Sequence, residues 1–293
     1  MRKWSQNRYT YMLVMPGLIL YVLFFVIPSL LGVVLSFTHI SQFSFQAIRF
    51  AGWINYVHVL TDSYLNAAIR NSFIFAFAST VLKVVIGMGL AVFLNQQLRM
   101  KSYLRTVFFL PAILSTVAVG VFFTSAMHPT TGMINNFLTY IGLDALTQHW
   151  LTDRQLAIYS LVMIETWKWA GFTMAIILAG LQSISKDYYE SAELEGASSL
   201  QKFKHITFPL IMPYFNNALI INLIGGLKVF DLVQAVTQGG PGSATEVFGT
   251  LVFKAFGSGR LGEGAAASIL LSLIVIAIVI PTWKAIARKE VEV

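Results

Sequence analysis

The sequence predicts an all-α polytopic membrane protein with six transmembrane helices, and two observations carry this prediction. Of the 293 residues, 56% are hydrophobic and 11% are charged, whereas soluble domains carry roughly 25% charged residues. Six stretches are also apolar enough, and long enough, to cross a bilayer as helices, which takes about 20 residues. We expect the whole chain, residues 1–293, to be one transmembrane domain.

The six predicted spans are residues 11–36, 68–94, 106–127, 156–182, 210–236 and 264–286. The first follows a basic start like that of a signal peptide. Its apolar run is too long for a signal peptide, contains Pro16 and Pro28, and lacks a clear small-residue cleavage site. We therefore expect it to be retained as a helix.

Lysine and arginine are distributed unevenly between the two sides of these spans. If the N-terminus is cytoplasmic, twelve lie on that side and five on the other, while Lys83, Lys168 and Lys228 fall within spans. The twelve are Arg2, Lys3, Arg8, Arg99, Lys101, Arg105, Lys186, Lys202, Lys204, Lys284, Arg288 and Lys289, and the five are Arg49, Arg70, Arg154, Lys254 and Arg260. Because cytoplasmic loops carry the excess of basic residues, both termini and residues 187–209 are predicted to be cytoplasmic. The same bias explains the net charge of +7 without a nucleic-acid partner.

Residue types that carry catalysis or bind metals are missing or scattered. There is no cysteine, which excludes disulfides, thiolate metal sites and cysteine nucleophiles. The five histidines show no metal-ligand spacing, and no Ser/His/Asp or paired-carboxylate arrangement stands out. We predict no catalytic residue and no metal site.

Residues 187–209 interrupt the apolar pattern with a polar segment. Asp187 followed by Glu190 has the form of a capping box that starts a helix, and Gly196 can end it. The same signal recurs at Ser198 and Gln201, which predicts a second helix. The segment is therefore predicted to be a helix, a glycine break and a helix on the cytoplasmic surface, between the fourth and fifth spans. Two prolines, at positions 209 and 213, are expected to limit the second helix before the fifth span begins.

Four of the thirteen acidic residues gather at the start of this segment: Asp187, Glu190, Glu193 and Glu195. Anionic lipid headgroups repel such a cluster, and helices that lie on lipid are usually basic. A protein partner is the better explanation, and an ordinary solvated helical loop stays open as the alternative.

The stretch "YESAELEGASSLQKFKHITFPLIMP" resembles the EAA loop of ABC importer permeases. Glu190, Ser191 and Ala192 match its E-A-A, with a serine, Ser191, in place of an alanine, and Gly196 matches its glycine. The resemblance implies that this segment is a coupling helix that docks on an ATPase. The residues it assigns to this contact are Asp187, Glu190, Ala192, Glu193, Gly196 and Phe203.

Further segments resemble the sugar-permease branch of that family, the type I fold of maltose- and glycerol-phosphate-type permeases. They are "FAGWINYVHVL", "YLRTVFFLPAILS", "GFTMAIILAGLQSIS", "KVFDLVQAVTQGGPGSATEV" and "GEGAAASILLSLIV". The resemblance implies an inward sugar or oligosaccharide permease in the cytoplasmic membrane of a prokaryote. Its implied partners are a second, similar permease, a dimer of ATPase subunits and an extracytoplasmic sugar-binding protein.

The chain contains no G-x-x-x-x-G-K-[ST] phosphate loop. The energy for transport must then come from a partner that binds ATP and Mg²⁺, so we predict no cofactor in this chain and no enzymatic activity of its own.

Ionisable residues inside a membrane are costly and tend to mark functional paths. Glu165 and Lys168 are three residues apart in the fourth span, and Lys228 and Asp231 repeat this spacing in the fifth, so each pair can neutralise itself on one helix face. A structural brace and a position on the translocation path both remain open for these pairs. Lys83 has no partner nearby in sequence and either snorkels or faces the bundle.

Sugar sites combine amides, charges and aromatic plates, because sugars offer hydroxyl groups and an apolar ring face. The predicted substrate path uses Trp167, Lys168, Asn222, Lys228, Phe230 and Asp231, with Trp169 as a further aromatic candidate. Helix packing is the alternative role for these side chains. Two other functions are weighed: an ABC permease for a solute other than a sugar, and a proton-coupled secondary transporter that uses Glu165 or Asp231, although we see no duplicated halves of the kind common in the latter class.

Overall fold

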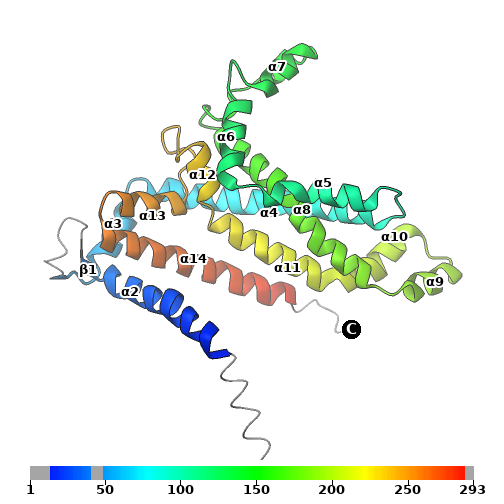
Figure 1. The fold of residues 1–293 in the computed structure, drawn as a ribbon, viewed down its shortest axis with the longest axis horizontal. Helices are drawn as coiled ribbons and strands as arrows, with labels where there is room; N and C mark the ends of the chain where they lie inside the picture. Colours follow the sequence, from blue (N-terminus) through cyan, green and yellow to red (C-terminus); the bar gives the residue numbers. More distant parts are fainter. Residues whose placement is uncertain (1–13, 41–48, 288–293) are drawn as a thin grey trace, which may run out of the picture. The chain divides into compact units, whose positions relative to one another are not determined.

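The computed structural model describes residues 14–40 and 49–287, and these are almost entirely helical (Figure 1). The chain divides into two compact units, one of Met1–Asp62 with Val252–Leu270 and one of Ser63–Leu251 with Leu271–Val293. The first three residues of the predicted first span, and five of the basic residues used to predict topology, lie outside the described residues. These five are Arg2, Lys3, Arg8, Arg288 and Lys289.

The first unit begins with a helix over Val14–Ser36, which contains a π-helical turn, η1 (Val22–Val26), and α2 (Ile27–Ser36). Two short strands follow, β1 (Thr38–His39) and β2 (Arg49–Phe50), paired antiparallel with Thr38 opposite Phe50. Helix α3 (Ile54–Thr61) comes next. The Asn55 amide donates to the backbone carbonyls of Ser36 and Thr38, both at 2.8 Å, and so ties α3 to the end of α2.

The second unit is built on three long helices, α4 (Leu65–Asn95), α8 (Ala157–Ser183) and α11 (Phe208–Leu227), which pack on one another. In α8, 67% of the most apolar stretch is buried, more than in the other candidate spans. Helix α8 is therefore the centre of this unit, with polar side chains that must find partners inside the protein because neither lipid nor water reaches them.

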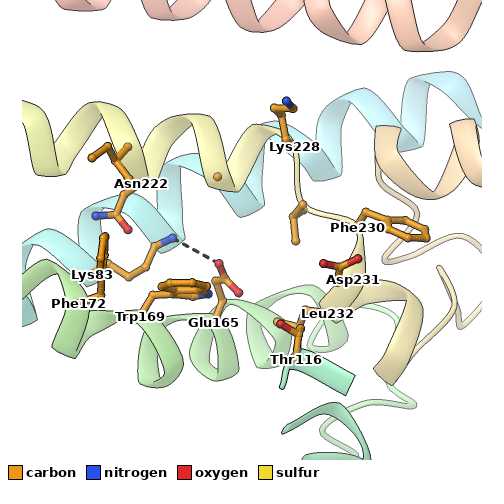
Figure 2. A pocket seen from close by; sticks show the side chains of 13 residues that line it. Lys83, Thr116, Glu165, Trp169, Phe172, Asn222, Lys228, Phe230, Asp231 and Leu232 are labelled. Atoms are coloured by element: carbon orange, nitrogen blue, oxygen red, sulfur yellow. Dashed lines mark ion pairs between the residues drawn. The ribbon is translucent and has the colours of Figure 1, made fainter. Parts of the chain in front are cut away.

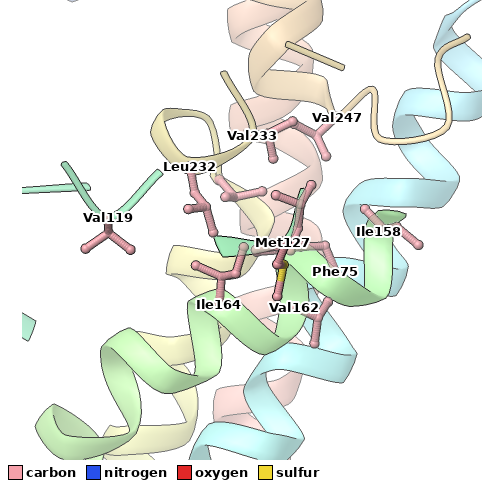
Figure 3. Close-up of a cluster of buried hydrophobic side chains, with 11 residues drawn as sticks. Phe75, Val119, Met127, Ile158, Val162, Ile164, Leu232, Val233 and Val247 are labelled. Carbon is pink, nitrogen blue, oxygen red and sulfur yellow. The ribbon is translucent and has the colours of Figure 1, made fainter. Parts of the chain in front are cut away.

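Two hydrophobic clusters occupy different stretches of α8. The Phe75 cluster joins α4, α8 and the residues around α12 (Asp231–Val236); its buried members are Phe75, Val119, Met127, Ile158, Leu161, Val162, Ile164, Val229, Leu232, Val233 and Val247 (Figure 3). The Met174 cluster joins the later parts of α4 and α8 to α11; its buried members are Ala91, Leu94, Met174, Ile177, Leu178, Leu181, Ile211 and Ala218. Residues 165–173 of α8 lie between the two clusters, and the ionisable residues of this helix are found there.

The structure divides the predicted third span, 106–127, between two helices. Helix α5 (Lys101–Ile113) and helix α6 (Thr116–Ala126) are bent by 93° relative to each other, because Leu114 and Ser115 adopt extended backbone angles. Helix α5 lies directly on α8: a Cβ atom at Gly171 would collide with the backbone carbonyl of Phe108. Only glycine permits this close approach of the two backbones.

The prediction of one helix over 210–236 is also wrong. Helix α11 ends at Leu227, residues 228–230 are not helical, and α12 begins at Asp231. Gly225 and Gly226 stand just before this break, and glycine lowers helix stability by about 1 kcal/mol relative to alanine. Lys228 and Asp231 therefore do not share a helix face and cannot form the predicted pair along one helix.

The remaining elements are short connecting helices and one further long apolar helix, α14 (Leu261–Ala287), which is also long enough to cross a membrane. They are α7 (Met133–Tyr140), the short 3₁₀ helix η3 (Asp144–Leu146), α9 (Lys186–Leu194), α10 (Ser199–Lys202), the π-helical turn η4 (Phe203–Thr207), α13 (Phe248–Gly257) and α14. Residues Ser199–Leu227 form one continuous helix, so Pro209 and Pro213 lie inside it instead of limiting it. The turn η4 ends at Thr207, two residues before Pro209, so the α-helical bonding pattern is interrupted just ahead of the proline, which reduces the cost of its missing N–H.

Candidate functional site

A cavity of about 230 Å³ lies where the second unit gathers its polar residues (Figure 2). It is bounded by α4, α8, the end of α11, the break after it, and the first residues of α6 and α12. Its lining consists of Lys83, Thr116, Glu165, Trp169, Phe172, Ile221, Asn222, Gly225, Lys228, Val229, Phe230, Asp231 and Leu232. We call it the central pocket.

An ion pair joins α4 to α8 at this pocket. The Nζ atom of Lys83 lies 3.5 Å from the Oε1 atom of Glu165, and the two side chains are 2% and 10% exposed (Figure 2). Lys83 therefore faces the bundle, and the partner of Glu165 lies on another helix. The predicted pairing of Glu165 with Lys168 along one helix is therefore corrected, because the ion-pair partner of Glu165 is Lys83 on α4.

Lys168 turns instead toward the start of α6. Its Nζ atom donates to the Thr116 hydroxyl at 2.8 Å and lies 4.6 Å from the ring centroid of Trp169. Thr116 is the first residue of α6, immediately after the 93° bend. Lys168 thus holds the bent segment against α8, and the two groups that it contacts both line the central pocket.

The pocket has an aromatic side and an amide. The Trp169 and Phe172 rings pack edge to face, with centroids 5.8 Å apart. Asn222 on α11 donates to the Thr173 hydroxyl at 2.9 Å and to the Ala218 carbonyl at 2.8 Å. Both amide hydrogens of Asn222 are then engaged, and its oxygen is the atom left to accept a further hydrogen bond.

Four of the six residues predicted for the substrate path line this pocket: Asn222, Lys228, Phe230 and Asp231. Lys168 stands behind the lining, as described above. Trp167 is not among the lining residues; its side chain packs edge to face on Phe123 and the residue is 45% exposed.

The sequence predictions did not include Thr116, Phe172 or the pairing of Lys83. A lysine inside a long apolar run is a signal that a partner exists, but no pattern in the sequence points to the helix that supplies it.

The second candidate site is the segment from α9 to α10, which we call the α9–α10 segment. Ser185 caps α9 by accepting a hydrogen bond from the Asp187 backbone at 3.3 Å, so the predicted cap at Asp187 is corrected by two residues. Gly196 ends the helix as predicted, with a φ of 78°. The backbone N–H groups of Gly196 and Ala197 donate to the carbonyls of Glu193 and Ala192, which is the Schellman arrangement.

Helix α10 begins with the predicted capping box of Ser198 and Gln201. Two further contacts tie the helices together. Lys202 donates to Glu193 at 2.6 Å, and the Tyr189 hydroxyl lies 3.0 Å from the Thr207 hydroxyl. The α9–α10 segment is thereby linked to the start of the long helix that reaches the central pocket.

Its surface mixes acidic and apolar side chains. Asp187, Glu190, Glu193 and Gly196 are exposed, whereas Ala192 and Phe203 are half-buried. Leu194 and Leu200 are 92% and 76% exposed. Large apolar side chains on an exposed tip favour contact with a protein partner, and this apolar component was not part of the sequence prediction.

Comparisons with known proteins agree with this architecture. The sequence profile of the binding-protein-dependent transport system inner membrane component family matches residues 83–283. A probable ABC transporter permease protein, YurN, from Bacillus subtilis is 34% identical over 94% of each chain. The trehalose/maltose transport system permease protein MalF from Thermococcus litoralis is 31% identical over 95% of this chain and 93% of its own.

A solved structure has the same fold. It belongs to a bacterial ABC transporter involved in the import of the acidic polysaccharide alginate, and it matches 98% of this chain and 99% of its own with a TM-score of 0.84 and 24% sequence identity. Within residues 14–40 and 49–287, five helices are long and apolar enough to cross a membrane, and the bent pair α5 and α6 can form a sixth span. The chain belongs to the family of binding-protein-dependent transport system inner membrane components.

Proposed function

We propose that this chain is a membrane-spanning subunit of an ATP-driven importer that carries a sugar or oligosaccharide into the cell, and that the central pocket is part of the sugar's path. The observation that carries the proposal is the combination of the Trp169 and Phe172 rings with hydrogen-bonding groups at the break between α11 and α12. Aromatic faces stack on sugar rings, and amide and carboxylate oxygens accept from sugar hydroxyls. The transport of trehalose and maltose by a system with a 31% identical permease supports the same substrate class.

The α9–α10 segment is the proposed docking element for the ATPase. Its exposed leucines supply apolar contact area, and its acidic residues, Asp187, Glu190 and Glu193, supply charge complementarity to a basic rim. Ala192 and Phe203 pack beneath this surface in the proposal, and Gly196 sets the angle between the two helices.

Movement of the docking element is expected to reach the pocket through one rigid helix. Residues Ser199–Leu227 are continuous, beginning beside Gly196 and ending next to Lys228 in the pocket lining. Rotation of this helix by the ATPase subunits shifts the non-helical residues 228–230, where the chain can change backbone angles at low cost. This link couples ATP hydrolysis to a change in the side from which the pocket is open.

The proposed assembly contains a second permease, similar but not identical to this chain, a dimer of ATPase subunits that binds ATP and Mg²⁺, and an extracytoplasmic sugar-binding protein. This chain itself has no catalytic role in the proposal. Both of its termini and the α9–α10 segment lie in the cytoplasm, in accord with the distribution of lysine and arginine. The exposed apolar faces of the long helices contact lipid or the second permease.

The proposal is tested by purifying the tagged chain from its own cells and identifying the bound proteins by mass spectrometry. We expect an ATPase and a second permease in stable association, and a solute-binding protein after cross-linking. The purified complex in proteoliposomes should then take up radiolabelled sugar in the presence of ATP and the binding protein. If the complex takes up an amino acid or an ion and no sugar, the proposed substrate class is wrong.

A proton-coupled secondary transporter is disfavoured by the family to which the chain belongs. The proteoliposome experiment also separates the two functions, because a secondary transporter accumulates its substrate on an imposed pH gradient without ATP.

A further inference from the structure

The lining of the central pocket is rich in hydrogen-bond acceptors. Glu165 and Asp231 both contribute carboxylates, and Asn222 contributes the oxygen of an amide whose hydrogens are already engaged. In Figure 2 the carboxylates of Glu165 and Asp231 lie on the same side of the pocket as Trp169. A ligand in this position meets three acceptor groups next to an aromatic plate.

Two of the three lysines near the pocket already have partners in its wall, and the third points away from its carboxylates. Lys83 is 2% exposed at its side chain and is held by Glu165 at 3.5 Å. Lys168 is not a lining residue, but its amine lies at the wall of the pocket, where it donates to Thr116, stands over the ring of Trp169 and interacts electrostatically with Glu165 and Asp231. Lys228 lines the pocket, but Figure 2 shows its amine directed away from Glu165 and Asp231.

We infer that the central pocket selects uncharged saccharides and rejects saccharides that carry carboxylates. Glu165 is a specificity-determining residue in this inference, because its ion pair with Lys83, the buried lysine of the lining, keeps that lysine from binding a carboxylate of the substrate. This inference rests on the proposed function. The hydroxyl groups of an uncharged sugar donate to the carboxylates while its ring face stacks on Trp169. A uronate brings a negative charge next to the Asp231 carboxylate, while Glu165 keeps Lys83 in an ion pair, and like charges brought together in a dry site are unfavourable. The expected selectivity differs from that of the structurally similar transporter for the acidic polysaccharide alginate.

The test uses the purified complex of this chain with its partner subunits in detergent, without the binding protein, so that the pocket's own preference is measured. Saturation-transfer difference NMR detects weak binding to large complexes, and three sets of trisaccharides serve as probes. They are neutral ones (maltotriose, cellotriose and arabinotriose), uronates (trigalacturonate and triguluronate) and the cationic glucosamine trisaccharide. Trp169→Ala is the control that assigns any signal to the pocket.

For the wild-type complex we expect saturation transfer to at least one neutral trisaccharide, lost in Trp169→Ala, and binding of the uronates weaker by about tenfold or more, the equivalent of ~1.4 kcal/mol. Binding of a uronate or of the glucosamine trisaccharide as tight as that of the best neutral probe would overturn the charge selectivity while leaving the saccharide pocket in place. Absence of Trp169-dependent binding for every probe would overturn the proposed function and this inference together.

A second measurement addresses Glu165 itself. Glu165→Gln releases Lys83 from its ion pair and keeps the shape of the side chain, so binding of the uronates should rise by about tenfold relative to the wild-type complex. The double variant Lys83→Met/Glu165→Gln removes the released cation and should return uronate binding to the wild-type level. Equal uronate binding by the wild type and an assembled Glu165→Gln complex would contradict the role of Glu165. If Glu165→Gln does not assemble, as judged by gel filtration, the comparison of probes on the wild-type complex still decides the charge selectivity.

Discussion

The Nζ atom of Lys83 on α4 lies 3.5 Å from the Oε1 atom of Glu165 on α8, and both side chains are almost completely buried. The pair sits between the Phe75 cluster and the Met174 cluster, beside the central pocket. Removing one partner of such a buried ion pair lowers stability strongly, because the remaining charge stays in a medium that cannot solvate it.

Lys83→Met is therefore expected to lower the stability of the complex by about 3–5 kcal/mol, the usual cost of leaving one buried charge without its partner. The double variant Lys83→Met/Glu165→Met should recover most of the loss, since apolar side chains of similar volume replace both charges. The measurement is the melting temperature of the detergent-purified complex by fluorescence-detected gel filtration. A double variant as unstable as the single one would show that the pair is not what joins α4 to α8 at this position.

The Lys83–Glu165 pair shows which contacts the sequence can predict and which it cannot. Glu165 was expected to pair with Lys168, because spacing along one helix is the relation that a sequence displays directly. Its partner lies on α4, far away in the chain, and only the packing of α4 on α8 brings the two together. The number of apolar helices, by contrast, follows from composition and length alone.

The ends of helices were predictable where a local signal exists. Gly196 and the Ser198 capping box are set by residues within a few positions of one another, and both predictions are confirmed. The bend between α5 and α6 falls at Leu114 and Ser115, which are ordinary residues in a helix of a membrane protein. Pro111 lies three residues before this break and is a local signal of an irregular helix. The neighbours of the two halves, α8 for α5 and α12 for α6, are tertiary contacts that no local pattern displays.

Gly196→Leu is expected to abolish coupling between ATP hydrolysis and transport, or to detach the ATPase, while membrane insertion is unchanged. The φ of 78° at this position costs a residue with a side chain roughly 1–2 kcal/mol, and the angle between α9 and α10 depends on it. Gly142→Leu is the matched control, because Gly142 has the same φ of 78° and equally open surroundings but lies outside the α9–α10 segment. Sugar uptake per ATP hydrolysed is measured in proteoliposomes. Normal coupling in Gly196→Leu would contradict the proposal that the α9–α10 segment docks on the ATPase.

Tyr189→Phe should lower the number of sugar molecules carried per ATP without changing the amount of assembled complex. The Tyr189 hydroxyl lies 3.0 Å from that of Thr207 and ties α9 to the long helix that ends at the pocket. One such hydrogen bond contributes about 1 kcal/mol to stability, too little to prevent folding. Thr207→Val removes the same bond together with the longer one from the Thr207 hydroxyl to the Lys202 carbonyl (3.4 Å), so it should uncouple at least as much, and the double variant should be no worse than Thr207→Val alone. Additive losses in the double variant would show that the two hydroxyls act separately.

The orientation in the membrane is tested by introducing cysteines into this cysteine-free chain. Ser199→Cys, at the start of the exposed α10, should react with a membrane-impermeant maleimide only after the cells are opened. Ser243→Cys, in the loop before α13, should react in intact cells. Labelling of Ser199→Cys from outside would invert the orientation, and the docking of a cytoplasmic ATPase on the α9–α10 segment would fail with it.

Asp231→Asn should preserve assembly and basal ATPase activity while lowering sugar uptake by about tenfold or more. Asp231 begins α12 and lines the central pocket, where a hydrogen bond from a sugar hydroxyl to a carboxylate is worth about 1.5–3 kcal/mol, and most of this is lost when the acceptor is neutral. Because Lys228 follows the last residue of α11 and the two side chains point in different directions in Figure 2, they are not a brace along one helix. Exchanging them, as Lys228→Asp/Asp231→Lys, is then expected to leave the complex assembled but poorly active. Asp144→Asn, an exposed carboxylate in η3 outside the pocket, is the control and should have normal uptake. Near-normal uptake by the exchanged variant would show that Asp231 and Lys228 serve as a structural charge pair and that the sugar passes elsewhere.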